Sequence, residues 1–291
     1  MQTVDEKLIT TDFIPFLSRK RVRVSVLRTD KIHPVISGNK WFKLKYYLED
    51  AKIQNKKRII TFGGAYSNHI VATAAACNMN GFESVGIIRG EEPRNYSHTL
   101  NDAMAYGMEL VFLSRQDYQN KIIPKDLMAV DNYVIAEGGY GALGAAGAAT
   151  VNYDRTGYDF VMAAVGTGTW MAGLINGKNP ESEVIGISVL KNNYELEKQV
   201  ADLLINEEKV NIVHDFHFGG YAKYTDEFIG FMNDFYNETE IPTDFVYTGK
   251  LFYGVKTLIE KNYFKPDSRI LIIHCGGLQG NLSLTESTLM F

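Results

Sequence analysis

Residues 37–47 read SGNKWFKLKYY, where a Gly-Asn turn signal runs into a helical pattern. Lys43 lies among aromatic residues and a leucine, close to the expected start of that helix. Burial and the neighbouring cations Lys40 and Lys45 both disfavour the ammonium form, so they lower the pKa expected for Lys43. A neutral lysine amine can form a Schiff base with a carbonyl compound. The structural alternative is an amphipathic helix whose lysines are solvated.

The composition describes an ordinary globular chain. It has 291 residues, 45% of them hydrophobic and 22% charged, within the range of soluble domains. The net charge of −4 argues against a nucleic-acid partner held by a basic surface. No apolar run approaches the roughly 20 residues that span a bilayer, and residues 1–20 contain no signal-peptide core. We therefore expect a cytoplasmic protein with neither a membrane nor a nucleic-acid partner.

Cysteines and histidines give no metal-site pattern. Cys77 and Cys275 are too few for a disulfide framework, and each lies in an apolar or small-residue stretch typical of a buried thiol. His214 and His217 have no cysteine or carboxylate motif beside them, so we interpret them as structural. No metal is expected.

Strand patterns alternate with helical patterns along the chain, which predicts βαβ units and a mostly parallel sheet. The expected strands are 21–27, 57–62, 83–89, 109–113, 132–136, 160–165, 184–190 and 269–274, and the expected helices are 41–54, 70–77, 98–106, 170–177, 194–204, 224–236 and 249–261. Ligands of open α/β sheets bind beyond the carboxyl ends of the strands, so the loops after strands are the candidate sites.

Three of these loops carry small polar residues. Residues 63–69 (GGAYSNH) combine two glycines with Ser67 and Asn68, either of which can cap the next helix. Residues 166–169 (GTGT) concentrate two glycines and two hydroxyls at a helix start, which makes an anion site. Residues 274–280 (HCGGLQG) close the last strand and can surround a ligand.

The loop at 166–169 suits a single phosphate group. Met171 stands where the dinucleotide fingerprint has glycine, and the Gly-Lys-Ser/Thr of a P-loop does not follow. A lysine able to form a Schiff base, together with a phosphate-sized anion site, indicates pyridoxal phosphate as the cofactor. A plain tight turn is the structural alternative for the loop.

Six segments in order along the chain resemble the family of 1-aminocyclopropane-1-carboxylate (ACC) deaminases and D-cysteine desulfhydrases. These are pyridoxal-phosphate enzymes of the tryptophan synthase β fold type. The segments are GNK..KL at 38–44, GG..SNH at 63–69, GG...LG..G at 138–147, GTGT..AG at 166–173, VYTGK at 246–250 and H.GG at 274–277. The resemblance implies a two-domain α/β fold of open, mostly parallel sheets flanked by helices. It also implies a large cofactor-binding domain (1–50 and 150–291), a small domain (51–149) inserted after the lysine helix, and a homodimer.

The resemblance assigns cofactor-binding roles residue by residue. Lys43, and neither Lys40 nor Lys45, would hold pyridoxal phosphate as its internal aldimine and later move the substrate's proton. The remaining cofactor contacts would come from Asn68 at the ring oxygen, from Gly166, Thr167, Gly168 and Thr169 at the phosphate, and from Thr248 at the pyridine nitrogen.

The resemblance also assigns the substrate side. Ser67, Asn68 and His69 would contact a small amino-acid substrate, with Ser67 at its carboxylate or near the reacting carbons. Tyr221 and Tyr247 match the family's two active-site tyrosines, although the residues after Tyr221 depart from the family's pattern. Without the resemblance, both tyrosines read as half-buried packing residues.

Thr248 is the residue that favours one reaction. The ACC deaminase pattern has glutamate after the tyrosine, and a carboxylate would stabilise a protonated pyridine nitrogen, which makes the ring a strong electron acceptor. Threonine offers only a neutral hydrogen bond, which suffices for a good leaving group such as thiolate. The sequence therefore predicts α,β-elimination of a small amino acid such as D-cysteine, giving pyruvate, ammonia and sulfide.

Several alternatives stay open at this point. Residues 278–280 (LQG) replace the Ala-Pro-Ala-like segment of the better-known desulfhydrases. ACC deaminase-type ring opening, a reaction on D-serine or another β-substituted amino acid, and a racemase-type reaction are alternative activities. A pyridoxal-phosphate-binding protein with little catalysis, or an α/β protein that binds phosphorylated ligands, are alternatives of other classes.

Overall fold

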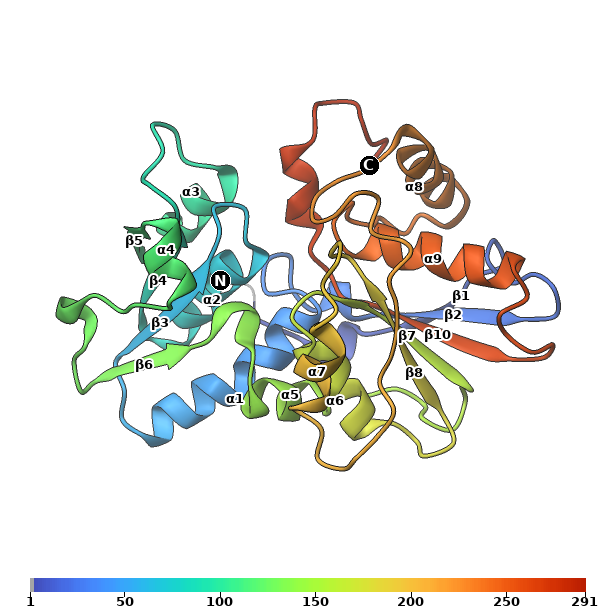
Figure 1. The fold of residues 1–291 in the computed structure, drawn as a ribbon, viewed down its shortest axis with the longest axis horizontal. Helices are drawn as coiled ribbons and strands as arrows, with labels where there is room; N and C mark the ends of the chain where they lie inside the picture. The colour runs from blue at the N-terminus through green and yellow to red at the C-terminus, as the bar shows by residue number, and fades with distance from the viewer. Residues whose placement is uncertain (1–2) are drawn as a thin grey trace.

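The computed structural model describes residues 3–291; residues 1 and 2, part of the predicted large domain, lie outside them. The chain forms two lobes, each built on a β-sheet (Figure 1). The larger sheet has the order β1-β2-β10-β7-β8-β9 and the smaller one the order β5-β4-β3-β6. The large-sheet strands are β1 (Thr11–Phe13), β2 (Arg23–Arg28), β7 (Phe160–Val165), β8 (Glu183–Ser188), β9 (Asn211–Val213) and β10 (Arg269–His274). The small-sheet strands are β3 (Arg58–Gly63), β4 (Glu83–Arg89), β5 (Met108–Leu113) and β6 (Asn132–Ile135).

Pairing in the two sheets is parallel apart from the antiparallel contact of β1 with β2. The central strands are β-branched and apolar, and in β7, β8 and β10 five consecutive residues are buried, as expected for a sheet covered on both faces. The predicted α/β class, with mostly parallel sheets flanked by helices, is thereby confirmed.

Helices cover both faces of the large sheet and separate the lobes. The α-helices are α1 (Asn39–Ile53), α2 (Asn68–Asn80), α3 (His98–Ala105), α4 (Arg115–Gln119), α5 (Ala142–Ala148), α6 (Thr169–Gly177), α7 (Leu196–Ala201), α8 (Asp226–Thr239) and α9 (Thr248–Glu260). The 3-10 turns are η1 (Glu6–Leu8), η2 (Thr29–Ile32), η3 (Lys125–Leu127), η4 (Glu137–Gly139) and η5 (Leu278–Ser283). Helices α8 and α9 pack into one core of the large lobe, and α6 and α7 into the other.

Helix α1 lies between the lobes, next to α5 and α6 (Figure 1). Two glycines allow the close approach. A Cβ at Gly147 would lie 2.0 Å from the Phe42 carbonyl oxygen of α1. A Cβ at Gly38, which has φ +54°, would lie 2.1 Å from the Cys275 carbonyl oxygen just after β10. The first turn of α1 is therefore docked onto the carboxyl end of a central strand, where ligands of α/β sheets bind.

Four strands and α-helices, β1, β9, α4 and α5, were not predicted from the sequence. Helix α4 has only five residues, too few for a clear helical period. Strands β1 and β9 have three residues each and no fully buried position, so they carry no clear alternation. Helix α5 is made of alanine, glycine and one leucine. Glycine is a poor helix former, so the sequence indicated only close packing or a bend there. Tertiary contacts with α1 and α6 hold this segment as a helix.

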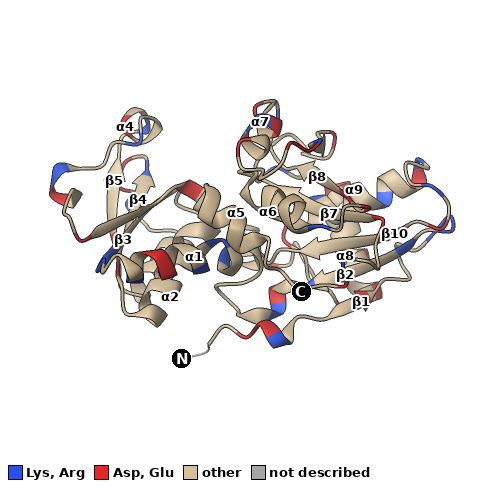
Figure 2. Ribbon diagram, turned by 90° about the horizontal axis from the view of Figure 1, so that it is seen from below, with Lys and Arg blue, Asp and Glu red and all other residues tan. Residues whose placement is uncertain are grey.

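Membrane-spanning helices and clusters of metal-ligating side chains are both absent from residues 3–291. Within residues 3–291, no helix is both long and apolar enough to cross a bilayer, and no group of three or more histidine, cysteine or acidic residues could hold a metal ion. His214 Nε2 lies 2.7 Å from Glu197 Oε1, and His217 Nδ1 accepts from the Gly219 N–H. Charges of both signs are interspersed over both lobes (Figure 2).

Candidate active site

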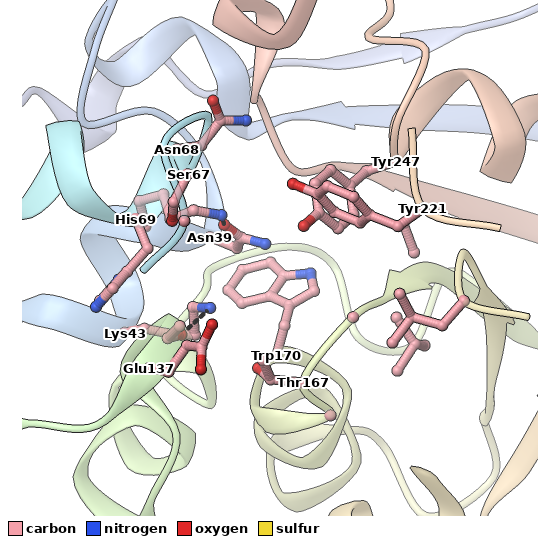
Figure 3. A pocket seen from close by; sticks show the side chains of 18 of the residues that line it. Asn39, Lys43, Ser67, Asn68, His69, Glu137, Thr167, Trp170, Tyr221 and Tyr247 are labelled. Carbon is pink, nitrogen blue, oxygen red and sulfur yellow. Dashed lines mark hydrogen bonds between the residues drawn. The ribbon is translucent and has the colours of Figure 1, made fainter. Parts of the chain in front are cut away.

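A cavity of about 430 Å³ lies between the lobes and collects most of the predicted site residues. Its walls come from α1, from the loops after β3 and β7, and from two tyrosines of the large lobe (Figure 3). The predicted residues that line it are Lys43, Ser67, Asn68, His69, Gly166, Thr167, Gly168, Tyr221 and Tyr247. Thr169 and Thr248 are not among its lining residues.

Lys43 is buried at one side of this cavity. Its Nζ donates to the Gly138 carbonyl oxygen at 2.5 Å. Burial lowers the pKa of Lys43 well below its ordinary value, and the charge of Lys40 lowers it further. Gly138 also packs on the glycine loop at 166–169, since a Cβ on Gly138 would lie 2.8 Å from Thr167 Cγ2. The Lys43 amine is therefore on the flank of the cavity nearest that loop.

Lys40, which was not expected to hold the cofactor, is a second amine in the same cavity. Its Nζ lies 2.8 Å from Asn39 Oδ1 and 5.8 Å from the centroid of the Tyr247 ring. Burial lowers its pKa, while attraction to Cys275 and Asp244 partly offsets that effect. Positions three apart share a helix face, so the spacing of Lys40 and Lys43 was the sequence signal that both amines point into one site.

The loop after β3 presents hydrogen-bonding groups that the protein does not use. Ser67 is the N-cap of α2, yet neither it nor Asn68 makes the predicted side-chain cap. Asn68 Nδ2 donates to the Gly277 carbonyl oxygen at 3.2 Å, while its Oδ1 is buried without a partner among the described residues. Buried polar atoms are normally paired, so a ligand is the natural partner for this amide.

His69 shows the same incomplete pairing. Its Nε2 lies 2.8 Å from Thr61 Oγ1, and its Nδ1 is buried with no partner among residues 3–291. Burial, followed by the charges of Lys43 and Lys40, lowers the His69 pKa well below its usual value. The ring is therefore neutral at physiological pH and can offer a hydrogen bond without a charge.

The loop after β7 is the segment where the sequence predicts an anion site. Gly168 is the N-cap of α6 with φ +84°, and a Cβ there would lie 2.9 Å from Val200 Cγ2. Only glycine fits this turn, which exposes the first N–H groups of α6 at the positive end of the helix. Thr167 lines the cavity, whereas Thr169 Oγ1 is buried inside α6 without a partner in the described chain.

The two tyrosines form the wall that faces α1 (Figure 3). Their ring centroids are 6.1 Å apart at an interplanar angle of 75°. Burial raises the pKa of both phenols, most strongly for Tyr247. The loop before Tyr221 is held by Lys250, whose Nζ donates to the carbonyl oxygens of His217 and Gly220 at 2.9 and 2.7 Å. No pattern in the sequence indicated that anchoring role.

Thr248 does not reach the cavity. It is fully buried, and its hydroxyl donates to Asp244 Oδ1 at 2.6 Å while accepting from the Asp244 N–H at 2.7 Å. Asp244 also accepts from the N–H groups of Val246, Tyr247 and Thr248. In this structure Thr248 therefore stabilises the turn that carries Tyr247, rather than presenting its hydroxyl to a ring nitrogen as predicted.

These residues fit pyridoxal phosphate. A buried amine of lowered pKa suits its aldehyde, the start of α6 suits its phosphate, and the Tyr247 ring offers a flat surface beside Lys40. The unpaired amide oxygen of Asn68 and the second hydrogen of its Nδ2 leave hydrogen-bonding capacity for the ligand.

Comparison with known proteins agrees with this fit. The family model described as "Pyridoxal-phosphate dependent enzyme" matches residues 14–276. A Pyrococcus furiosus protein, provisionally named a 1-aminocyclopropane-1-carboxylate deaminase, is 31% identical over 92% of this chain and 88% of its own. The mitochondrial bifunctional D-cysteine desulfhydrase/1-aminocyclopropane-1-carboxylate deaminase of Arabidopsis thaliana is 29% identical over 88% of this chain and 72% of its own. The solved structure of an ACC deaminase homologue has a TM-score of 0.80 at 29% identity, covering 94% of this chain and 90% of that one.

Proposed function

The chain belongs to the pyridoxal-phosphate-dependent enzymes, and on that premise we propose that it catalyses α,β-elimination on a small β-substituted amino acid such as D-cysteine. The products would be pyruvate, ammonia and sulfide. The observation that carries the proposal is one cavity holding buried amines of lowered pKa beside a helix-start anion site. When bound, the cofactor supplies an electron acceptor for the charge that develops on the substrate's α-carbon.

The charges around the cavity support elimination over ring opening. Of its lining residues within 3–291, Glu137 is the only carboxylate, and it pairs with Lys121 at 2.5 Å. The nearby Asp244 carboxylate is already occupied by its four hydrogen bonds. A pyridine ring without a free carboxylate beside its nitrogen is a weaker electron acceptor. Thiolate is a good leaving group, so its elimination needs less electron withdrawal by the cofactor ring than the opening of a cyclopropane ring does.

Lys40 and Lys43 are both candidates for the covalent bond to the cofactor, and their positions in the cavity support different roles. Both have lowered pKa values, so position decides. Lys43 donates to the Gly138 carbonyl oxygen, and Gly138 packs on Thr167 of the loop 166–169, so a cation at Lys43 would offset phosphate charge there. Lys40 lies over the Tyr247 ring, where the cofactor's own ring would stack. We therefore propose Lys40 for the covalent bond and for proton transfer, and Lys43 for the phosphate, which revises the sequence-based assignment of Lys43.

The other lining residues have roles that follow from their groups. Ser67 and the N–H groups at the start of α2 suit the substrate carboxylate, because a helix N-terminus favours an anion. Tyr221 and Tyr247 stay protonated at neutral pH, since burial raises their pKa values. They can therefore donate hydrogen bonds into the cavity. Asn68 would hold the cofactor's ring oxygen through Nδ2.

ACC ring opening is the second candidate, because the Arabidopsis relative is named for both activities. We also propose a cytoplasmic homodimer, as the family resemblance implies. A purified protein that turns yellow with added pyridoxal phosphate and releases pyruvate from D-cysteine, but not comparably from ACC, is the expected result. L-cysteine and D-serine complete the assay and define the handedness and leaving group. A colourless protein, or equal turnover of ACC and D-cysteine, would contradict the proposal.

A further inference from the structure

A second hollow of about 690 Å³ opens directly from the candidate active site. The two cavities share five lining residues, namely Gly64, Ala65, Tyr66, Arg89 and Glu137. We call this second hollow the vestibule; its remaining lining residues are Arg115, Tyr118, Gln119 and Lys121. Since the walls are shared, a molecule held in the active-site cavity can extend one end into the vestibule.

The small sheet explains why these residues meet. Its four strands are parallel, so their carboxyl ends lie along one edge. Arg89 ends β4, Arg115 follows β5, residues 64–66 follow β3 and Glu137 follows β6. Helix α1 faces the same cavity from between the lobes. The vestibule therefore lies at the carboxyl edge of a parallel sheet, which is where open α/β sheets bind ligands.

The charges of the vestibule favour an anion. Lys121 and Glu137 pair with each other at 2.5 Å, so they neutralise one another. Within residues 3–291, neither Arg89 nor Arg115 forms an ion pair with a carboxylate. The Arg89 guanidinium stands 5.9 Å from the Tyr118 ring centroid and has an Nη2 atom 3.6 Å from where a Gly64 Cβ would lie. Arg89 therefore borders both the active site and the vestibule, and Arg115 borders the vestibule; both residues are exposed, and neither is paired with a carboxylate of the described chain, in a protein whose net charge is −4.

We infer that the vestibule binds an anionic group at the side-chain end of the substrate. This inference rests on the proposed α,β-elimination, and it extends the substrates beyond D-cysteine to amino acids whose β-substituent is negatively charged at neutral pH. The α-carboxylate would stay at Ser67 in the active-site cavity, while Arg89 and Arg115 bind the second anion. A guanidinium fork matches carboxylate, sulfonate or phosphate oxygens in two parallel hydrogen bonds.

Elimination of such a substrate balances without an oxidant or reductant. With O-sulfoserine, the Cβ–O bond breaks and its electron pair leaves with sulfate, while the α-proton passes to the lysine amine. One water then converts the remaining carbon skeleton to pyruvate and ammonium. The guanidiniums would stabilise the charge that builds on the departing group.

Binding of a matched acid and amide tests the inference without turnover. Calorimetry of the cofactor-loaded protein should show D- or L-aspartate binding about tenfold tighter than the corresponding asparagine, the scale of one charged hydrogen bond. Arg89→Met should abolish this preference and Arg115→Met should reduce it. Arg23→Met is the matched control, because Arg23 is exposed on the large sheet and stands over an aromatic ring at 5.2 Å, as Arg89 does. Equal binding of acid and amide, or equal loss in the Arg23 variant, would overturn the inference.

Two further experiments test whether a free anion binds at the same place, and whether this inference can fail independently of the proposed function. Inorganic sulfate should compete with aspartate; sulfate that binds through Arg89 alongside aspartate would overturn the inference. Arg89→Met should raise KM for O-sulfoserine about tenfold and leave that for O-acetylserine unchanged. A protein that prefers the acid but makes no pyruvate from D-cysteine loses only the proposed function. A protein that eliminates D-cysteine but binds acid and amide alike loses only this inference.

Discussion

The carboxyl ends of both sheets face the active-site cavity, but the two lobes present different chemistry there. In the large lobe, β7 and β10 run into glycine loops, with Gly168 at the start of α6 and Gly277 beside Asn68. In the small lobe, β4 and β5 run into charged side chains, Arg89 and Arg115. Backbone N–H groups suit one invariant group such as a phosphate, whereas side chains can be matched to a particular substrate. We therefore call the large-lobe side of the cavity the cofactor half and the small-lobe side the substrate half.

Hydrogen bonding differs in the same way. On the large-lobe side, the Asp244 carboxylate has four donors, which fix the turn before Tyr247. On the small-lobe side, Asn68 Oδ1 and His69 Nδ1 are buried and unpaired within the described chain. A saturated network is rigid, and an unsaturated one has capacity left for a ligand.

The largest expected effect concerns the lysines of α1, which lie between the two halves. Lys40→Ala should leave the protein colourless with pyridoxal phosphate and lower kcat by at least about 10³-fold, the scale of losing a catalytic acid–base group. Lys43→Ala should keep the yellow colour and weaken cofactor binding. Borohydride reduction followed by peptide mapping should find the cofactor on Lys40. Label on Lys43, with Lys40→Ala still yellow, would restore the sequence-based assignment. Lys45→Ala, which removes an amine paired with Glu6, is the control.

The cofactor half can be tested at Gly168. Gly168→Ala places a Cβ 2.9 Å from Val200 Cγ2 at φ +84°, so the loop must shift and cofactor affinity should fall at least about tenfold, the loss expected for one charged hydrogen bond. Gly81→Ala is matched in backbone strain, with φ +75°, but has open space around it. Fluorescence titration with pyridoxal phosphate should therefore separate the two variants. Equal affinities would contradict a phosphate site at this helix start.

The substrate half can be tested at Ser67. Its side chain lines the cavity and makes no capping hydrogen bond, so Ser67→Ala should raise KM for the amino acid up to about tenfold. Cofactor affinity should stay the same, because the phosphate site lies in the other lobe. Ser182→Ala, which removes a hydroxyl bonded to the Tyr158 carbonyl far from the site, should change neither quantity. If Ser67→Ala lowered cofactor affinity and left KM unchanged, Ser67 would belong to the cofactor site, and its assignment to the substrate half would be wrong.

The last expected effect concerns stability and not activity, as a pH dependence from Lys250 in the large lobe. Burial lowers its pKa from 10.5 to about 8, so between these values the unfolded chain binds a proton that the folded protein does not. The free energy of unfolding should therefore rise with pH across this window, by at most about 1.4 kcal/mol per pH unit, and show no such slope below pH 8. Urea titrations of the wild type and Lys250→Met should diverge only within the window. If the free energies of unfolding of the two proteins changed in parallel across the window, the lowered pKa of Lys250 would be contradicted.

The sequence predicted the elements whose signals are local. Periodicity located α1, β4, β7 and β10, with the residue bounds of β4, β7 and β10 given correctly. The glycine loops after strands indicated the candidate anion site, because a helix start and a positive φ are properties of a few neighbouring residues. Short or glycine-rich elements such as β1 and α5 lacked that local signal, since contacts elsewhere in the chain hold them in place.

By itself the sequence determined the α/β class, the cofactor indicated by a lysine with a phosphate-type loop, and nine of the 22 residues that line the cavity. Only the tertiary structure decided which partner each of them meets. It placed Lys40 beside Tyr247, tied the Thr248 hydroxyl to Asp244, and brought Arg89 next to Arg115 at one sheet edge. These contacts depend on how helices and strands pack, and residues far apart in sequence carry no local pattern that records their distance in the fold.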